Sequence, residues 1–176
     1  MLPGRLVADD HAPYFERYTS LVTEDDLIDL LRRQGEAVPD ALGTLDDAQA
    51  GHRYAPEKWT VREVIGHLTD TERVFGYRAL ALARDPGADL PSFDENVYAA
   101  HAPHDRVPIA ALAEEFAALR RSHIYLFEAL DAAAWNHAGR VSGGPGTPRG
   151  MAYILAGHLR HHAAILTARY SVPLTA

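Results

Sequence analysis

The sequence contains no cysteine, a single lysine and no long apolar run. The absence of cysteine excludes disulfide bonds, thiolate metal ligands and a cysteine nucleophile, and it is compatible with a reducing compartment. No stretch approaches the roughly 20 apolar residues that a membrane-spanning helix needs, and the N-terminal residues lack the apolar run of a signal peptide. We therefore expect a cytoplasmic protein that does not enter a membrane.

Positive charge is also scarce, since 17 lysines and arginines face 24 aspartates and glutamates and the formal net charge is −7. Nucleic-acid binding needs clustered lysine and arginine to neutralise phosphates, so we expect no nucleic-acid partner. The length of 176 residues suffices for one well-buried core and is too short for two ordinary domains. We expect residues 1–176 to form a single domain.

Four segments have the apolar periodicity of long helices. The first is predicted to begin after an N-cap at Thr23, where three acidic residues meet the positive end of the helix, and to kink at Pro39. The second has a capping box formed by Thr60 and Glu63 and extends over residues 61–84.

The two later helices also carry start signals. Pro108 is predicted at the first position of the third helix, whose apolar stripe continues to Leu130. Thr147 is predicted as the N-cap of the fourth, with Pro148 at the first helical position and an end near Tyr170.

The connections define the expected topology. Residues 85–107 form a connection much longer than the roughly 2–8 residues usual between bundle helices, which allows the second and third helices to run parallel. No segment shows β-alternation, and the glycine-rich residues 139–146 are expected to be a mobile loop. The fold class predicted is all-α: a four-helix bundle with one long crossover between the second and third helices.

Histidines on two of these helices suggest a metal site. His158 and His162 are spaced i, i+4, which places both imidazoles on one helix face about 6 Å apart, where one ion can bridge them. His67, on the second helix, borders an inward stripe and is the natural third ligand. Three imidazoles without a carboxylate or thiolate leave coordination positions open, as in a reactive site.

Several residues have alternative interpretations. His161 is also a helical neighbour of His158 at i, i+3, but we favour His162, which with His158 flanks the apolar line of the fourth helix. Asp70 and Glu72 could orient an imidazole ligand, although helix acids are more often solvated or paired with arginine. On the apolar stripe of the third helix, His123 is expected to be a hydrogen-bonded core residue. Five histidines are expected in loops or on the surface: His11, His52, His101, His104 and His137.

Three motifs together carry a family resemblance. They are Trp59-x-x-x-Glu63-x-x-x-His67, the segment Leu90–Asn96 and the terminal Gly157-His158-x-x-x-His162. With their surroundings, over residues 14–171, they resemble the DinB/YfiT superfamily. The resemblance implies a four-helix bundle with a long crossover, frequent homodimers and a divalent metal, often nickel or zinc, bound by His67, His158 and His162.

The resemblance also implies chemistry. Characterised relatives join low-molecular-weight thiols such as bacillithiol or mycothiol to electrophiles, and one group isomerises maleylpyruvate with an extra C-terminal domain for which this chain has no room. A cation stabilises thiolate from a thiol whose pKa is about 8.5. Our leading expectation is a metal-dependent thiol transferase acting on a small-molecule substrate. Residues 93–98 would wall its pocket, and Arg78 would bind an anionic thiol cofactor unless it forms a surface ion pair.

Two other functions remain open. The same metal could lower the pKa of bound water toward 7 and support hydrolysis, with Asp70 or Glu72 as the general base. Alternatively, the bundle could bind metal or dimerise without catalysis.

Overall fold

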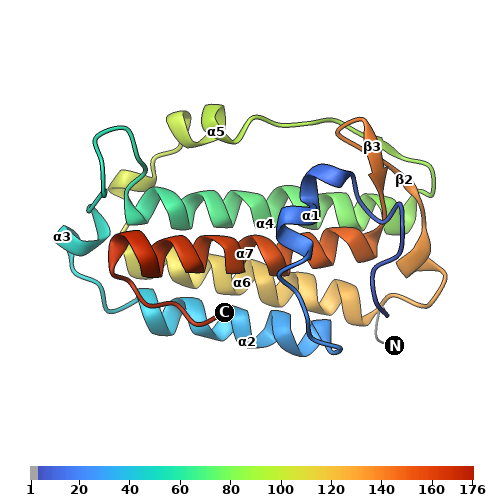
Figure 1. Cartoon of the computed structure of the whole chain (residues 1–176), viewed down its shortest axis with the longest axis horizontal. Helices are drawn as coiled ribbons and strands as arrows, with labels where there is room; N and C mark the ends of the chain where they lie inside the picture. The colour runs from blue at the N-terminus through green and yellow to red at the C-terminus, as the bar shows by residue number, and fades with distance from the viewer. Residues whose placement is uncertain (1–3) are drawn as a thin grey trace.

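The computed structural model describes residues 4–176, and four long helices lie side by side in it as a bundle (Figure 1). They are α2 (Leu27–Leu42), α4 (Val61–Arg84), α6 (Ile109–Glu128) and α7 (Pro148–Tyr170). Both α4 and α2 pack against α6 and α7. The predicted four-helix bundle is confirmed. Residues 1–3, part of the stretch searched for a signal peptide, lie outside the described residues.

The capping motifs of α4 and α7 are confirmed. The Thr60 hydroxyl accepts a hydrogen bond from the Glu63 amide, and the Glu63 carboxylate accepts one from the Thr60 amide. The Thr147 side chain accepts a hydrogen bond from the Gly150 amide, and Pro148 is the first helical residue. These bonds satisfy amides that have no partner within the helix, and so they fix where the helices start.

The prediction for the start of α2 was wrong. Asp26, not Thr23, is the N-cap, and its carboxylate accepts a hydrogen bond from the Asp29 amide at 2.9 Å. The preceding segment stays outside the helix because Glu24 pairs with Arg160 of α7. The helix continues through Pro39 for three residues, and Pro108 is the N-cap of α6 and not its first residue.

The long crossover contains structure of its own. It includes β1 (Asp89–Leu90), the short helix α5 (Glu95–His101) and a 3-10 turn (His104–Arg106). In Figure 1 it returns along one side of the bundle, so that α4 and α6 run in the same direction, as predicted. Both α5 and the 3-10 turn contact α4, and the ring of His104 in that turn packs against Gly66 in the first half of the helix.

The structure adds a small sheet that we did not predict. β1 pairs in parallel with β2 (Gly139–Val141), which pairs antiparallel with β3 (Gly144–Gly146). Strands of two or three residues are too short to show alternation, and Val141 is fully buried. The expected mobile loop at residues 139–146 is therefore a hairpin anchored in the core.

Shorter elements complete the fold. They are the 3-10 turn Pro13–Phe15, α1 (Glu16–Thr19), α3 (Asp47–Ala50) and the 3-10 turn Ala134–Asn136. In the part of the chain described here, no helix combines the length and apolarity needed to span a membrane.

A polar layer divides the core of the bundle into two apolar clusters. One cluster contains Phe75 and Ile154, and the other contains Ile65 and Leu159. On each long helix a polar residue lies in sequence between the two clusters, and these four residues are Gln34, Glu72, Arg120 and His158. The layer therefore crosses the bundle at the level of the histidines on α7.

Gly157 sets the approach of α1 to α7. A Cβ at this position would overlap the backbone carbonyl oxygen of Tyr18. We expect Gly157→Ala to lower the free energy of unfolding by about 1–3 kcal/mol, because the backbone of α1 must move away. Helix propensity alone would raise the free energy of unfolding by roughly 0.5–1 kcal/mol. The sign of the change measured by urea denaturation therefore shows which of the two effects is larger. A stabilised variant would contradict this packing argument.

Candidate metal centre

Three histidines converge between α4 and α7. His67 comes from the second turn of α4, and His158 and His162 come from consecutive turns of α7. The Nε2 atom of His158 lies 3.1 Å from Nε2 of His67 and 3.1 Å from Nε2 of His162. One ligand nitrogen from each residue lies within 4.8 Å of the other two.

The geometry of the three nitrogens fits a metal ion. A tetrahedral ion bound at 2.0–2.1 Å holds its ligand nitrogens about 3.4 Å apart, close to the spacing here. Each Nε2 carries either one hydrogen or one lone pair. Nε2 of His158 can therefore form at most one ordinary hydrogen bond, although it lies within 3.1 Å of two other nitrogens. A cation satisfies all three lone pairs at once.

Burial keeps these imidazoles neutral, the form that binds metal. Desolvation lowers the pKa of His67 to about 4 and that of His162 to about 3. The pKa of His158 also lies well below its ordinary value of 6.5, for the same reason and because the other histidines lie close. At neutral pH a metal therefore displaces no proton from the three nitrogens.

Aromatic rings cover two of the three histidines. The ring of Trp59 lies 4.9 Å from that of His67, and the ring of Tyr18 meets His158 edge-on at 5.1 Å. His161 contacts the same tyrosine at 5.3 Å and is not one of the three converging histidines. The structure thus brings together His67, His158 and His162, the set preferred from sequence.

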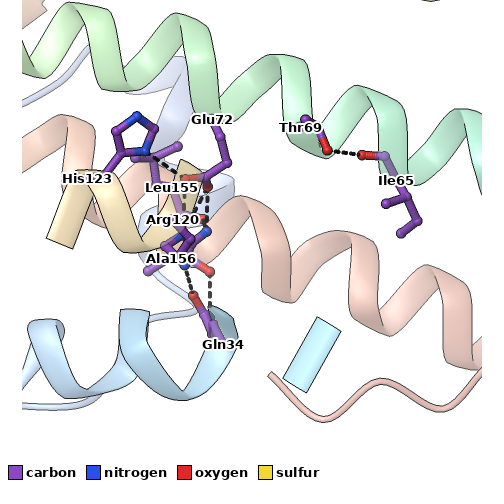
Figure 2. Close-up of polar contacts among 8 residues, drawn as sticks. All are labelled: Gln34, Ile65, Thr69, Glu72, Arg120, His123, Leu155 and Ala156. Atoms are coloured by element: carbon purple, nitrogen blue, oxygen red, sulfur yellow. Dashed lines mark hydrogen bonds and ion pairs between the residues drawn. The ribbon is translucent and has the colours of Figure 1, made fainter. Parts of the chain in front are cut away.

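The two acidic candidates both pair with arginine, the alternative given for them from sequence, and not with a metal-binding histidine. Glu72 is fully buried and accepts hydrogen bonds from Arg120, the shortest at 2.6 Å, and contacts Nδ1 of His123 at 3.0 Å (Figure 2). Asp70 contacts Arg73 at 3.3 Å and His104 at 3.4 Å. Neither carboxylate bonds to the three converging histidines in the described residues, since α4 turns both away from the cavity.

The remaining histidines largely follow the predictions. His123 is the expected hydrogen-bonded residue at the edge of the core, and His52 and His101 are exposed. His104 is buried, contrary to prediction, because its ring packs against α4 where Gly66 has no side chain. His11 and His137, placed in loops by the prediction, are half-buried.

A cavity of about 470 Å³ opens beside the three histidines. Residues from α4, α7, the N-terminal segment and the crossover line it. From the crossover, Phe93, Glu95 and Asn96 contribute to the wall, whereas Tyr98 is exposed and does not line it. The predicted wall at residues 93–98 is therefore partly correct. Arg78 also lines the cavity and is buried, and in the described residues it forms no surface ion pair.

Two polar residues of the cavity, Glu95 and Thr71, were given no chemical role by sequence reasoning. Glu95 lies in a short helix within the crossover, and it entered the sequence analysis only as part of the segment Leu90–Asn96 and of the expected wall at residues 93–98. Its carboxylate opposes the effect of burial on His67 by raising the pKa of that imidazole, more than any other charge does. Only the folded crossover shows that this acid faces the cavity.

Comparison with known proteins agrees with this architecture. The sequence profile of the DinB superfamily matches residues 30–166, which is most of the chain. The chain belongs to the DinB superfamily. No curated protein sequence matches this member of the superfamily.

A solved structure shares the fold. It is YfiT from Bacillus subtilis, described as a probable metal-dependent hydrolase with an unusual four-helix bundle topology. The two proteins are 17% identical, with a TM-score of 0.74 over 83% of this chain and 86% of YfiT. At this identity the likeness establishes the bundle topology of this DinB protein and no activity.

Proposed function

We propose that this DinB protein is a metal-dependent hydrolase that cleaves a small ester or amide in the cavity. His67, His158 and His162 would hold a divalent cation, which would act as a Lewis acid and lower the pKa of water toward neutrality. The observation that carries the proposal is the carboxylate of Glu95, which faces the same cavity from the crossover. The description of YfiT as a probable metal-dependent hydrolase is consistent with it.

Glu95 fits the role of general base. It is half-buried, and in the described part of the chain its carboxylate has no hydrogen bond or ion pair with another side chain. A carboxylate free of internal partners can accept a proton from a water molecule and return it to a leaving group. Glu72 cannot do so, because Arg120 and His123 occupy its oxygens.

The size of the cavity favours a second candidate, the thiol transfer that the sequence resemblance implied. A volume of about 470 Å³ lies within the range of pockets that hold ligands of drug size. It could therefore hold a thiol of a few hundred daltons beside a small electrophile. In that reaction the cofactor supplies the nucleophile, since the chain has no cysteine.

The decisive experiment measures turnover with and without a thiol. Protein loaded with Zn²⁺ or Ni²⁺ is assayed on p-nitrophenyl esters and anilides, alone and with bacillithiol, mycothiol or glutathione. We expect thiol-independent turnover, and we expect Glu95→Gln to lower kcat by about 10²–10⁴-fold at unchanged metal content. Glu114→Gln on the exposed face of α6 serves as the matched control.

The outcomes separate the candidates. If turnover requires a thiol, the protein is a thiol transferase and the proposed hydrolysis is wrong. An unchanged kcat in Glu95→Gln would show that Glu95 is not the general base. Inactivity under all conditions would overturn both enzymatic proposals.

A further inference from the structure

The end of the cavity away from the histidines contains a buried cation. Arg78 is only 2% exposed, and its Nη2 donates hydrogen bonds to the carbonyl oxygen of Pro91 at 2.7 Å and to Oγ of Ser142 at 3.1 Å. Its guanidinium lies 4.7 Å from the ring centre of Phe75 and 5.4 Å from that of Phe93. Contacts with three separate segments hold the group in one position.

This cation lacks an acidic partner. Within residues 4–176, no carboxylate pairs with Arg78, and its Nε and Nη1 form no hydrogen bond. Burial lowers the pKa of Arg78 below its ordinary value. Buried charges in proteins are normally paired, because transferring a charge out of water is costly. Donors without partners beside a cavity therefore indicate a place for an anion.

A hydroxyl between the two ends is also without a partner. Thr71 lines the cavity, is 3% exposed, and its Oγ1 forms no hydrogen bond within the described residues. Helical threonines commonly bond back to a carbonyl one turn earlier, as Thr69 does to Ile65 at 2.9 Å (Figure 2). The hydroxyl of Thr71 is thus available to a ligand.

These groups lie along one face of α4. His67, Thr71, Phe75 and Arg78 are spaced by four, four and three residues, and all four line the cavity. The Cα atoms of His67 and Arg78 are separated by about 16 Å along the helix, at 1.5 Å per residue. A ligand that reaches both ends must be elongated.

We propose that this protein takes an elongated small molecule bearing a carboxylate. Arg78 binds that carboxylate, Thr71 hydrogen-bonds to a polar group in its middle, and the reactive end lies beside the three histidines. The assignment of the reactive end rests on the proposed hydrolysis, whereas the contact with Arg78 can be measured without turnover. The donors that Arg78 has left, on Nε and Nη1, can each bind a carboxylate oxygen, and hydrogen bonds from a charged donor to a carboxylate are stronger than neutral ones.

The test uses metal-free protein and a matched pair of probes. N-benzoyl-β-alanine carries a carboxylate and a central amide, and N-benzoyl-β-alaninamide differs in lacking the charge. We expect the acid to bind at least tenfold more tightly than the amide, with Kd determined by NMR titration. Arg78→Gln should weaken binding of the acid about 10–100-fold, and Thr71→Val should weaken it about 3–10-fold. Arg78→Gln should weaken binding of the amide less than it weakens binding of the acid.

Matched variants separate binding from folding. Arg17 lines the same cavity but is exposed, so Arg17→Gln should change Kd less than threefold. Thr69→Val removes an existing hydrogen bond and should lower the Tm without affecting Kd. Thr71→Val should leave the Tm unchanged or raised. Arg78→Lys, which keeps the charge, should retain part of the affinity and guards against a misfolded glutamine variant.

Two results would overturn this assignment. Equal binding of acid and amide would exclude a carboxylate site, and loss of binding with Arg17→Gln but not Arg78→Gln would move the anion to the rim. Because no metal is present, neither result depends on whether the protein is a hydrolase. Binding of the acid to the metal-free protein, together with no turnover of the esters and anilides by the metal-loaded protein, would uphold the anion site and overturn the proposed hydrolysis alone.

Discussion

Replacing Glu72 by glutamine is expected to lower the free energy of unfolding by about 3–5 kcal/mol. The change leaves the guanidinium of Arg120, which is fully buried, without its counter-charge. Arg120 donates to both oxygens of Glu72 and also to Oε1 of Gln34 at 2.7 Å (Figure 2). Removing one partner of a buried pair costs far more than the pair itself contributes, because the remaining charge stays out of water.

A double variant that removes both charges tests the same ion pair between Glu72 and Arg120. With Glu72→Gln and Arg120→Met together, no charge is left unpaired, so the combined loss should be clearly smaller than the sum of the two single losses. Urea denaturation of the metal-free protein at pH 7 measures all three. The exposed pair Arg33–Asp29 provides the control, and Arg33→Met should cost less than about 1 kcal/mol. Additive losses would contradict the coupling.

The pH dependence of this effect has a definite sign. Burial by itself raises the pKa of Glu72, but the charge of Arg120 and the hydrogen bonds of Arg120 and His123 outweigh it and hold the pKa below the ordinary 4.5. A carboxyl group with a lowered pKa in the folded state stabilises fully above its unfolded pKa and loses this contribution as pH falls below it. The difference in the free energy of unfolding between wild type and Glu72→Gln should therefore become smaller below pH 4.5.

This network also connects to the candidate metal centre. Arg120 donates to the carbonyl oxygen of Leu155 at 3.3 Å, and Nε2 of Gln34 donates to that of Ala156 at 3.0 Å. Both carbonyls belong to the turn of α7 that precedes His158. The polar layer thereby fixes α7 against α2, α4 and α6 at the level where its histidines must meet His67.

The sequence was sufficient to predict the helices because their start signals are local. The capping box of Thr60 and Glu63 and the Thr147–Pro148 pair each satisfy their own backbone amides, so tertiary contacts need not be known. Thr23 failed as a cap because Glu24 is held by Arg160, which lies 136 residues away. A partner so distant in sequence leaves no local pattern.

The candidate site likewise contains some residues that the local sequence predicts and others that depend on tertiary contacts. His158 and His162 share a helix face by spacing alone, and the bundle brings His67 to them. Glu72 stayed open between orienting an imidazole ligand and pairing with an arginine, because the pattern of α4 does not reveal Arg120 on α6. Glu95 was expected only as part of the wall at residues 93–98, because the direction of its side chain depends on how the crossover folds over α4. Such residues can be assigned only from contacts between elements.

Replacing His158 by alanine is expected to abolish metal binding. Its Nε2 is the atom that lies within 3.1 Å of both other ligand nitrogens, so its loss leaves two imidazoles that no longer enclose an ion. Wild-type protein purified without a histidine tag should hold one Zn²⁺ or Ni²⁺ per chain, and His158→Ala should hold less than about a tenth of that. Metal analysis by mass spectrometry measures both, and His161→Ala should retain the metal.

Stability gives an independent measure of the same loss. A ligand present at 1,000 times its Kd stabilises the folded state by about 4.1 kcal/mol, so added metal should raise the Tm of wild type and of His161→Ala but not of His158→Ala. Thermal melts with and without a chelator separate this effect from any packing defect in the variant. Full metal content in His158→Ala, or its loss in His161→Ala, would contradict the assignment.

Proton competition distinguishes this buried site from a surface cluster of histidines. Three imidazoles with the ordinary pKa of 6.5 would lose about 50-fold in metal affinity between pH 7.5 and 6.0, since each must be deprotonated to bind. Burial has already lowered the pKa of His67 to about 4 and that of His162 to about 3. Affinity measured by competition with a metal-binding dye should therefore change less than about twofold over this interval, because the folded protein holds the nitrogens neutral throughout.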